Sequence, residues 1–223
     1  MNPCFAYPPA TRFGRVIPKN KIYQHASATA ALKRRFVALV DHIRWAHKLA
    51  PATLNLNPSP QVPEIQVFHL QLREPSVDTK ILRAIDQAIP FPLIFELTCG
   101  ERLLVAAAHK RPSEADKHKW VISEHFHSDW RPLETERAPL PVATSMDKLY
   151  EQLLSPLLPV AADAEDSLPA RIDRTQAIAA QQRAIDRLQA RLRREPQFNR
   201  RVAINAELRD AVRQLHQLNG PTG

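Results

Sequence analysis

Glycine is scarce in this sequence, and its scarcity excludes several classes of enzyme. The 223 residues contain only Gly14, Gly100, Gly220 and Gly223. The G-x-x-x-x-G-K-[ST] loop of P-loop nucleotide hydrolases and the G-x-G-x-x-G turn of Rossmann enzymes both need several glycines at fixed spacing. Neither motif is present. No G-x-S-x-G sequence occurs either, so the nucleophile elbow of α/β-hydrolases is missing as well.

Cysteines and long apolar runs are also few. Cys4 and Cys99 lie far apart, and neither belongs to a C-x-x-C pair, which favours free thiols in a reducing compartment. The first residues show no charged start followed by an apolar run, and no later stretch approaches the ~18 consecutive apolar residues of a membrane span. We therefore expect a cytoplasmic protein without a signal peptide, a membrane segment or a cofactor.

Acidic residues are nearly absent from the first 60 positions, where Asp41 is the single example. The basic residues of the same stretch are Arg12, Arg15, Lys19, Lys21, Lys33, Arg34, Arg35, Arg44 and Lys48. The formal net charge of the whole chain is +8. A one-sided basic field attracts polyanions such as nucleic acid, and it can equally steer docking onto an acidic protein surface.

Residues 29–50 show the apolar spacing of an amphipathic helix. Their apolar side chains recur mostly at steps of three and four, and Pro51 follows directly. The pattern predicts one helix that ends before Pro51 and leads into an extended, proline-rich connector. Four basic residues fall largely on its polar side and are candidate contacts for nucleic acid or a partner: Lys33, Arg34, Arg44 and Lys48.

The middle of the chain is predicted to form strands around one helix. "EIQVFHLQL" alternates as a strand, "DTKILRAIDQAI" is an amphipathic helix with Asp78 as its cap, and "FPLIFEL" and "RLLVAAAHK" form a hairpin that turns at Gly100. "KWVISEHF" adds a further strand. This order predicts an α+β domain, in which helices pack on a mixed sheet.

The C-terminal third predicts helices. "SMDKLYEQLLSPLL" is a helix with Ser145 as its cap, and the acidic stretch "VAADAEDSLPARID" reads as a linker. Two amphipathic helices then meet at Glu195-Pro196-Gln197, with the proline in the first turn of the second helix. The alternative is one continuous helix that is kinked at the proline. We expect a globular domain over 1–160, a linker over 161–173 and an antiparallel helical hairpin (coiled coil) over 174–219.

Five arginines surround the predicted turn of this hairpin, within "ARLRREPQFNRRVAIN". We call them the arginine tip: Arg191, Arg193, Arg194, Arg200 and Arg201. The planar guanidinium binds phosphate or carboxylate through two parallel hydrogen bonds, so these residues are candidate contacts for nucleic acid or an acidic partner. The alternative is a turn that is merely well solvated.

Two other groups raise the question of metal chemistry. His125 and His127 lie two residues apart on one predicted strand, a spacing that can hold a metal, but no third ligand has an obvious position. Glu64 and Glu96 are not followed by the acid-x-lysine pattern of a magnesium-dependent nuclease. We expect satisfied or exposed histidines and no metal, while a nuclease stays an alternative.

Five blocks carry a resemblance to a known family: "FGRVIPKNKIYQHA", "IRWAHKLAPATLNL", "EIQVFHLQL", "AIDQAIPFPLIFEL" and "REPQFNRRVAIN". Together they resemble the bacterial domain of unknown function DUF4391, from about Phe13 to Leu218. The family brings no catalytic residues. The resemblance implies a gene context of DNA methyltransferases and superfamily 2 helicases in restriction-like clusters that act against phage.

We therefore interpret the protein as a non-enzymatic accessory subunit of an antiviral complex, with a helicase or a DNA methyltransferase as its partner and DNA as a second contact. Two alternatives stay open, a metal-dependent nuclease and a structural adaptor that never meets nucleic acid. DNA binding that weakens steeply with salt would distinguish the DNA-contacting subunit from the adaptor, because phosphate contacts release counterions.

Overall fold

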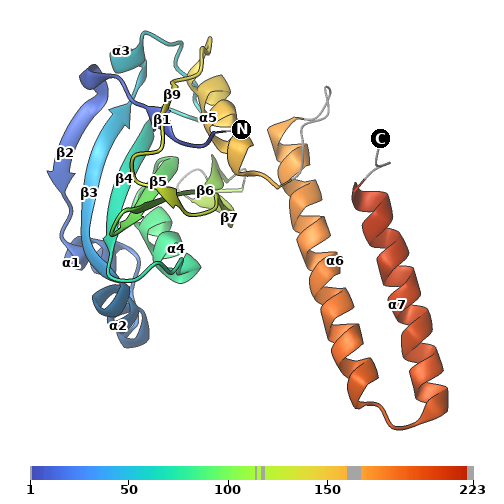
Figure 1. The fold of residues 1–223 in the computed structure, drawn as a ribbon. Coiled ribbons are helices and arrows are strands. Elements are labelled where there is room, and N and C mark those ends of the chain that lie inside the picture. The colour runs from blue at the N-terminus through green and yellow to red at the C-terminus, as the bar shows by residue number, and fades with distance from the viewer. Residues whose placement is uncertain (1, 114, 117–118, 160–166, 220–223) are drawn as a thin grey trace. The chain divides into compact units, whose positions relative to one another are not determined.

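The fold is taken from a computed structural model of the chain, which describes residues 2–113, 115–116, 119–159 and 167–219. The chain divides into two compact units, Met1–Leu157 and Leu158–Gly223. We call the first the sheet unit and the second the hairpin unit, and each is described by itself. Figure 1 shows the elements of both units.

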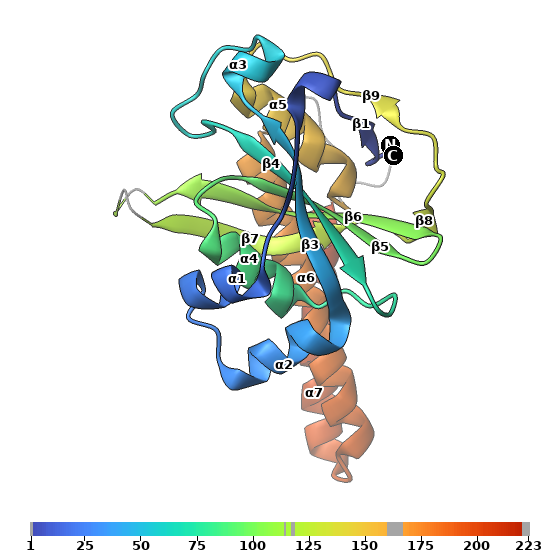
Figure 2. The same ribbon diagram turned by 90° about the vertical axis from the view of Figure 1, so that its left-hand side faces the viewer.

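A twisted mixed sheet forms the centre of the sheet unit (Figure 2). Its strands are ordered β2-β3-β4-β5-β6-β7, and β8 pairs with β6. Of these neighbours β4 and β5 run parallel, and the others are antiparallel. The strands are β2 Arg12–Val16, β3 Val40–Leu49, β4 Ile65–Leu72, β5 Leu93–Cys99, β6 Arg102–Pro112, β7 Trp120–His127 and β8 Arg131–Pro132.

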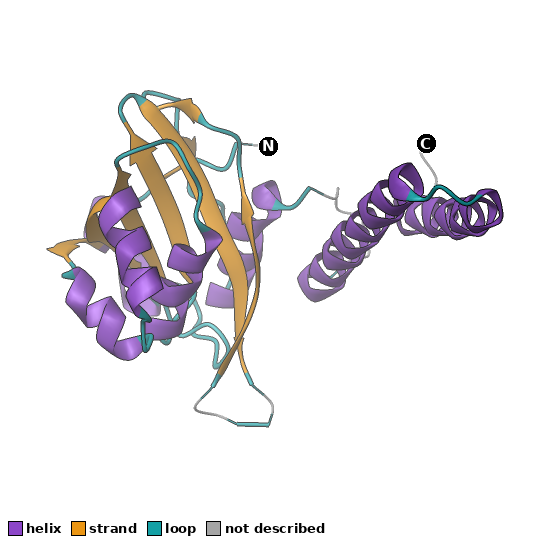
Figure 3. Cartoon of the chain, turned by 90° about the horizontal axis from the view of Figure 1, so that it is seen from below, coloured by secondary structure: helices purple, strands orange, loops and turns teal. Residues whose placement is uncertain are grey.

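Helices cover both faces of the sheet (Figure 3). On the first face lie α1 (Lys19–His25), α2 (Ala30–Leu39) and α4 (Thr79–Ala88), the last of which makes the crossover that parallel strands require between β4 and β5. Their apolar side chains bury Phe36, Phe68, Phe95 and Ile85 in one core. We call this side the helix face.

The opposite side, which we call the strap face, carries α5 (Met146–Leu154), the short helices η1 (Pro9–Thr11) and η2 (Ser155–Leu157), and a small parallel pair of strands. The pair joins β1 (Phe5–Ala6) to β9 (Ala138–Pro139). Tyr150 of α5 fastens this helix to the sheet, because its hydroxyl donates to the carbonyl of Ala108 over 2.7 Å. Thus the α+β architecture expected from the sequence is confirmed.

The predicted helix over residues 29–50 is wrong in its second half. The helix ends at Leu39, and Val40–Leu49 form β3. The register shifts twice against β4, once between Val40 and His42 and once between Trp45 and His47. Each β-bulge adds a residue, so the fully buried or nearly buried positions of this strand recur every third residue at Val40, Ile43, Ala46 and Leu49. A strand with this spacing imitates a helix in sequence.

The connector and the cap differ in detail from expectation. Residues Pro51–Leu54 form a short helix, α3, rather than extended chain, with the proline at its first position where no donor is needed. Ser145 does occupy the N-cap of α5, but its side chain makes no capping hydrogen bond. Asp78 caps α4 as predicted, since its carboxylate accepts from the amide of Lys80.

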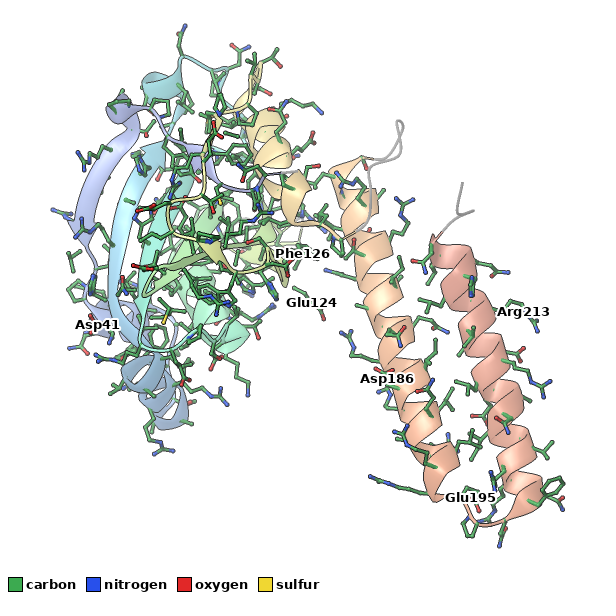
Figure 4. The ribbon with its side chains drawn as sticks, viewed as in Figure 1. Asp41, Glu124, Phe126, Asp186, Glu195 and Arg213 are labelled. Carbon is green, nitrogen blue, oxygen red and sulfur yellow. The ribbon has the colours of Figure 1, made fainter. Side chains whose placement is uncertain are left out.

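The hairpin unit consists of two helices, α6 (Leu168–Arg194) and α7 (Phe198–Asn219). They run antiparallel, because Gln181 of α6 donates to the carbonyl of Ala211 over 2.9 Å, while Arg191 lies 3.5 Å from Glu207, nearer the turn. Figure 4 shows Glu195 at the turn. Pro196 also belongs to this turn, which corrects its predicted position in the first turn of the second helix.

The linker predicted over 161–173 is only partly tested by the structure. Residues 161–166 lie outside the described part of the chain. Leu168–Asp173 already belong to α6, whose first turn is capped by the hydroxyl of Ser167 accepting from the amide of Ala170. The polar composition of this stretch is typical of a linker, but a cap residue followed by a proline is also typical of the start of a helix.

The core of the helix face should dominate the stability of the sheet unit. Phe95 lies fully buried in the middle of β5, so Phe95→Ala should lower the free energy of unfolding by about 3–5 kcal/mol, because it removes packing and leaves a cavity. Val37→Ala on the exposed side of α2 should cost under about 0.5 kcal/mol. Urea unfolding followed by circular dichroism measures both. Equal costs for the two variants would contradict this packing.

Candidate functional site

The four basic residues predicted on one helix do not all share one surface. Lys33 and Arg34 are exposed on α2. Arg44 and Lys48 lie on β3, opposite His69 and Gln66 of β4, and hence point to opposite sides of the sheet. The second bulge sets this arrangement, because it places Arg44 on the strap face and Lys48 on the helix face. The predicted single basic patch is therefore wrong.

The ionic environments of these residues also differ. Lys48 forms an ion pair with Glu64 at 2.9 Å. Lys33 lies over the ring of Tyr23, with its ammonium 5.7 Å from the ring centre. Arg34 and Arg44 have no ion pair among the residues that the structure describes. The four residues therefore differ in how far their charge is already compensated within the fold.

The arginine tip, in contrast, is one local cluster. Arg191, Arg193 and Arg194 occupy the last turn of α6, and Arg200 and Arg201 lie in the first turn of α7. All five are exposed. Only three residues, Glu195 to Gln197, separate the two helices, so the arginines of both helices gather around the same short turn.

The electrostatics of the tip are asymmetric. Arginines at the end of α6 match the negative end of its dipole, but those at the start of α7 meet a positive end, and the first turn of α7 contains no acid. Arg191 has one loose ion pair, 3.5 Å from Glu207. The guanidinium groups of Arg193, Arg194, Arg200 and Arg201 have no partner within the described residues. The tip thus offers unpaired donors and a positive helix end to an anion.

A hollow of about 450 Å³ adjoins the arginine tip. It is lined by Arg187, Ala190, Arg191, Arg194, Glu195 and Ile204. Three of these six residues are arginines, against one acid. The hollow gives an anion a recess beside the exposed guanidinium groups, rather than a flat surface alone.

The two histidines of β7 do not form a metal site. The side chain of His125 is buried and lies 2.7 Å from Asp86 of α4, whereas His127 is exposed, with its Nδ1 3.0 Å from the carbonyl of Ser128. Within the described residues no three His, Cys, Asp or Glu side chains are grouped so that they could hold a metal ion. Pairing with a carboxylate of α4 gives His125 a structural role.

Asp86 belongs to a buried polar group on the helix face. Lys110 of β6 donates from its ammonium to the carbonyls of Asp86 and Ile89 at the end of α4, and the Asp86 carboxylate lies 3.7 Å from it. Burial lowers the pKa of Lys110 from 10.5 to about 8, although Asp86 opposes this shift. The lysine satisfies the last carbonyls of the helix, as basic side chains at helix C-termini do.

A second polar network crosses the strap face. Glu96 of β5 is buried and accepts two hydrogen bonds from Arg137, 2.7 Å to Oε1 and 2.9 Å to Oε2. Nε2 of His69, on β4, lies 3.0 Å from Oε2 without the alignment of a good hydrogen bond. Burial alone would raise the pKa of Glu96, but His69 and Arg137 outweigh it and lower this pKa from 4.5 to about 2.

His47 extends this network to the N-terminal segment. The hydroxyl of Thr11 donates its single proton to the carbonyl of Pro8 over 2.7 Å and lies 3.0 Å from Nδ1 of His47. Nδ1 must therefore carry the proton in this contact, which leaves Nε2 as the acceptor. Burial, and next the ring of His69, lower the pKa of His47 below 6.5, so the ring is neutral at neutral pH.

The network fastens the segments of the strap face to the sheet. Arg137 donates to the carbonyl of Phe5 as well as to Glu96, and the ring of Tyr7 lies 4.8 Å from that of His47. Sequence reasoning missed Glu96 as a structural anchor and did not find Arg137 or His69. The single acid in the otherwise apolar strand "PLIFEL" was the available signal, because a buried carboxylate needs a basic partner.

The acids considered for a nuclease are both engaged. Glu64 pairs with Lys48 at 2.9 Å, and Glu96 is held by Arg137 and His69. Glu64 lies directly before β4, toward the helix face, and Glu96 lies in β5 on the strap face. The two carboxylates therefore do not converge on one metal position.

Fold and sites together define an α+β protein that carries an arginine-tipped helical hairpin. The chain belongs to the family described as "Domain of unknown function (DUF4391)", whose model matches residues 5–215. No curated protein and no solved structure matches the chain. Among the described residues no helix is both long and apolar enough to cross a membrane.

The ion pair of Glu96 should make stability depend on pH. Because the pKa of Glu96 is lowered from 4.5 to about 2, its contribution is complete above pH 4.5 and is lost as the pH falls toward 2. Glu96→Gln should cost about 3 kcal/mol at pH 7, since one pKa unit corresponds to about 1.4 kcal/mol. The cost should shrink between pH 4.5 and 2.

Urea unfolding at a series of pH values measures this cost, with Glu134→Gln as the control on an exposed acid. The control should follow the parent protein at every pH. A penalty for Glu96→Gln that is the same at pH 7 and at pH 2.5 would contradict the assigned ion pair.

Proposed function

We propose that this protein is a non-enzymatic binding subunit that contacts nucleic acid through the arginine tip of its helical hairpin. The observation that carries the proposal is the cluster of exposed guanidinium groups, four of which have no partner among the described residues. Unpaired charges are costly to gather in one place, because they repel each other. A polyanion that neutralises them turns this repulsion into attraction.

The choice of basic residue supports phosphate as the target. Residues 158–223 contain eleven arginines and no lysine. A solvated turn would be served equally well by lysine, whereas the arginine fork forms paired hydrogen bonds with phosphate oxygens. The positive end of α7 and the absence of acids in its first turn act in the same direction.

The hairpin geometry suits a contact that depends on the backbone and not on the sequence of the nucleic acid. The arginines lie on two helix ends whose separation is fixed by a turn of three residues, so their docking orders fewer backbone dihedrals than that of a free tail. Contacts to phosphate position a protein on nucleic acid but carry no sequence information by themselves.

A second candidate function is that of an adaptor that docks onto a partner helix. It is favoured by apolar side chains on α7 that are open to solvent, namely Phe198 with 76% of its surface exposed and Val202 with 50%. Both lie beside the arginine tip, at helical spacing of four residues. In that case the arginines would frame a protein interface and recognise carboxylates.

The gene context expected for the family supports a proposal for the biological setting. We propose a helicase or a DNA methyltransferase of an antiviral, restriction-like system as the partner, with the protein acting in the cytoplasm. Such enzymes work on DNA, so a subunit that holds phosphate beside them fits their chemistry. Copurification from the native gene cluster, followed by mass spectrometry, identifies the partner.

Arginine pairs on α7 provide a matched test of the tip. Arg200→Gln with Arg201→Gln should weaken binding of a 20-base-pair DNA duplex about tenfold at 0.1 M salt, because two phosphate contacts are removed. Arg209→Gln with Arg213→Gln removes the same charge from the same helix away from the tip, and Figure 4 shows Arg213 pointing away from α6. That variant should bind within about twofold of the parent, and fluorescence anisotropy measures both.

Equal losses in the two variants would show that net charge, and not the tip, binds DNA. No DNA binding by the parent protein, together with loss of the copurified partner in the Arg200 and Arg201 variant, would favour the adaptor. All of these residues are exposed, so thermal unfolding should shift little in either variant.

A further inference from the structure

A second hollow, in the sheet unit, has the features of a ligand site and is independent of the hairpin. It lies on the helix face, between α1, the ends of β3 and β4, and the segment after α4, and has a volume of about 400 Å³. Ligand pockets usually measure roughly 300–1,000 Å³ and are largely apolar with a few polar groups. Its lining is Ile17, Lys21, Ile22, His25, Trp45, Lys48, Glu64, Gln66, Phe68, Ala88, Ile89, Pro90 and Phe91.

The walls of the hollow are flat and apolar. Trp45 and Phe68 are stacked, with ring planes 10° apart and ring centres at 6.2 Å. The indole N–H of Trp45 donates to the carbonyl of His47 over 2.9 Å, which fixes the orientation of this ring. Phe91, partly buried, adds a third aromatic residue. Aromatic walls of this kind suit a planar ring system.

A buried amide lies among these apolar walls. Gln66 is only 3% exposed and donates from Nε2 to Oε1 of Glu64. This contact fixes the amide orientation, because a carboxylate can only accept. The side-chain oxygen of Gln66 receives no hydrogen bond from the described residues, and the second amide hydrogen is not used either. The Gln66 oxygen is not one of the buried polar atoms that lack a partner, so it is open to the hollow, where a ligand can donate a hydrogen bond to it.

The hollow carries a small excess of positive charge. Lys21 on α1 and Lys48 on β3 belong to its lining, and Glu64 is the single acid of this lining. Lys48 already neutralises Glu64 at 2.9 Å. Lys21 is exposed and has no ion pair within the described residues. An anionic group on the ligand is therefore favoured near α1.

We propose that this hollow binds a single nucleotide, with the base against Trp45, Phe68 and Phe91 and the phosphate at Lys21. These features are complementary to two parts of that ligand, its base and its phosphate. Aromatic rings contact the base, and the free donor and acceptor of Gln66 match the polar edge of a base, as glutamine amides do in nucleic-acid recognition. A fatty acid would match the walls and the charge but would leave the Gln66 amide unpaired.

The nucleotide can come from two sources, free mononucleotide or an unpaired position in a single strand. An adjoining hollow of about 540 Å³ shares His25, Ala88 and Pro90 with the first and adds Lys119 and Trp120. Both hollows therefore contain aromatic and basic residues, which is the composition of surfaces that bind single strands. Both sources present the same base and phosphate to the first hollow.

Isothermal titration of the full-length protein tests the proposal. The probes are AMP, GMP, CMP and UMP, adenosine, inorganic phosphate, and a ten-nucleotide single strand with its duplex. At least one mononucleotide should bind, at least tenfold more tightly than its base-free or phosphate-free part. Because the arginine tip also attracts phosphate, the strand is compared in the variant with Arg200→Gln and Arg201→Gln. In that variant, a single strand that binds more than tenfold better than every mononucleotide identifies the strand as the source, and the reverse order identifies the free nucleotide.

Two variants assign binding to the hollow. Gln66→Leu keeps the size of the side chain and removes both free polar groups, so it should weaken nucleotide binding at least tenfold. Lys21→Gln, on the exposed rim, should weaken AMP binding but leave adenosine binding unchanged. Lys33→Gln on α2 is the matched control for charge and should have no effect, and Arg200→Gln with Arg201→Gln should leave mononucleotide binding intact.

Several results would overturn the proposal. They are the absence of binding by every nucleotide and by the single strand at millimolar concentration, equal effects of Lys21→Gln and Lys33→Gln, or equal affinity for phosphate and for the mononucleotide that binds best. If Gln66→Leu does not fold, the comparison of Lys21→Gln with Lys33→Gln still tests whether the hollow binds the nucleotide. Loss of duplex binding in the hairpin variant, with mononucleotide binding retained, leaves this proposal standing on its own.

Discussion

Two β-bulges in β3 determine which side chains each face of the sheet unit receives. The added residues, near Asp41 and at Ala46, change the alternation of the strand twice. As a result Trp45 and Lys48 both point to the helix face, where they line the proposed nucleotide site, while Arg44 and His47 point to the strap face. A regular strand would put Trp45 and His47 on the same side of the sheet. Neither the proposed nucleotide site nor the polar network that includes His47 would then form.

The polar networks on the two faces have a common logic. Each places one buried carboxylate, Asp86 or Glu96, where it can hold elements that are distant in sequence. Asp86 joins α4 to β7 through His125, and Glu96 joins β5 to the segment before β9 through Arg137. Breaking such a pair leaves an uncompensated charge in the interior, which costs far more than the intact pair contributes. These groups are therefore anchors of the fold, and the exposed sites lie elsewhere.

The hairpin unit combines little buried area with a high density of arginine. Of the residues on α7 only Ile204 and Ala211 are buried, so most of the helix surface is open to solvent. The functional proposal depends on this contrast. A short turn that joins two helices holds five arginines in place, while the apolar side chains of Phe198 and Val202 remain exposed next to them.

Much of this architecture could be predicted from the sequence, wherever a pattern of residues is typical of only one kind of secondary structure. Strict alternation identified β4 correctly, and a capping aspartate located the start of α4. The prediction for β3 was wrong because a bulged strand and an amphipathic helix give the same spacing of apolar residues. The partners of Glu96 could not be found, since Arg137 lies 41 residues away and nothing local indicates that they meet. The hollow lined by Trp45 could not be predicted from the sequence either, since it combines residues from α1, β3, β4 and the segment after α4.

The arginine tip was predictable because it is local: five arginines within eleven residues meet wherever the chain makes one turn. Whether they bind phosphate is decided most directly by the dependence of DNA binding on salt. For the parent protein the logarithm of the association constant should fall linearly with the logarithm of the salt concentration, because phosphate contacts release counterions. Changing Arg193, Arg194, Arg200 and Arg201 together to glutamine should reduce the slope by about 0.9 for each phosphate that the protein no longer neutralises. An unchanged slope in this variant, at unchanged affinity, would contradict the account and leave the arginine tip without a role in nucleic-acid binding.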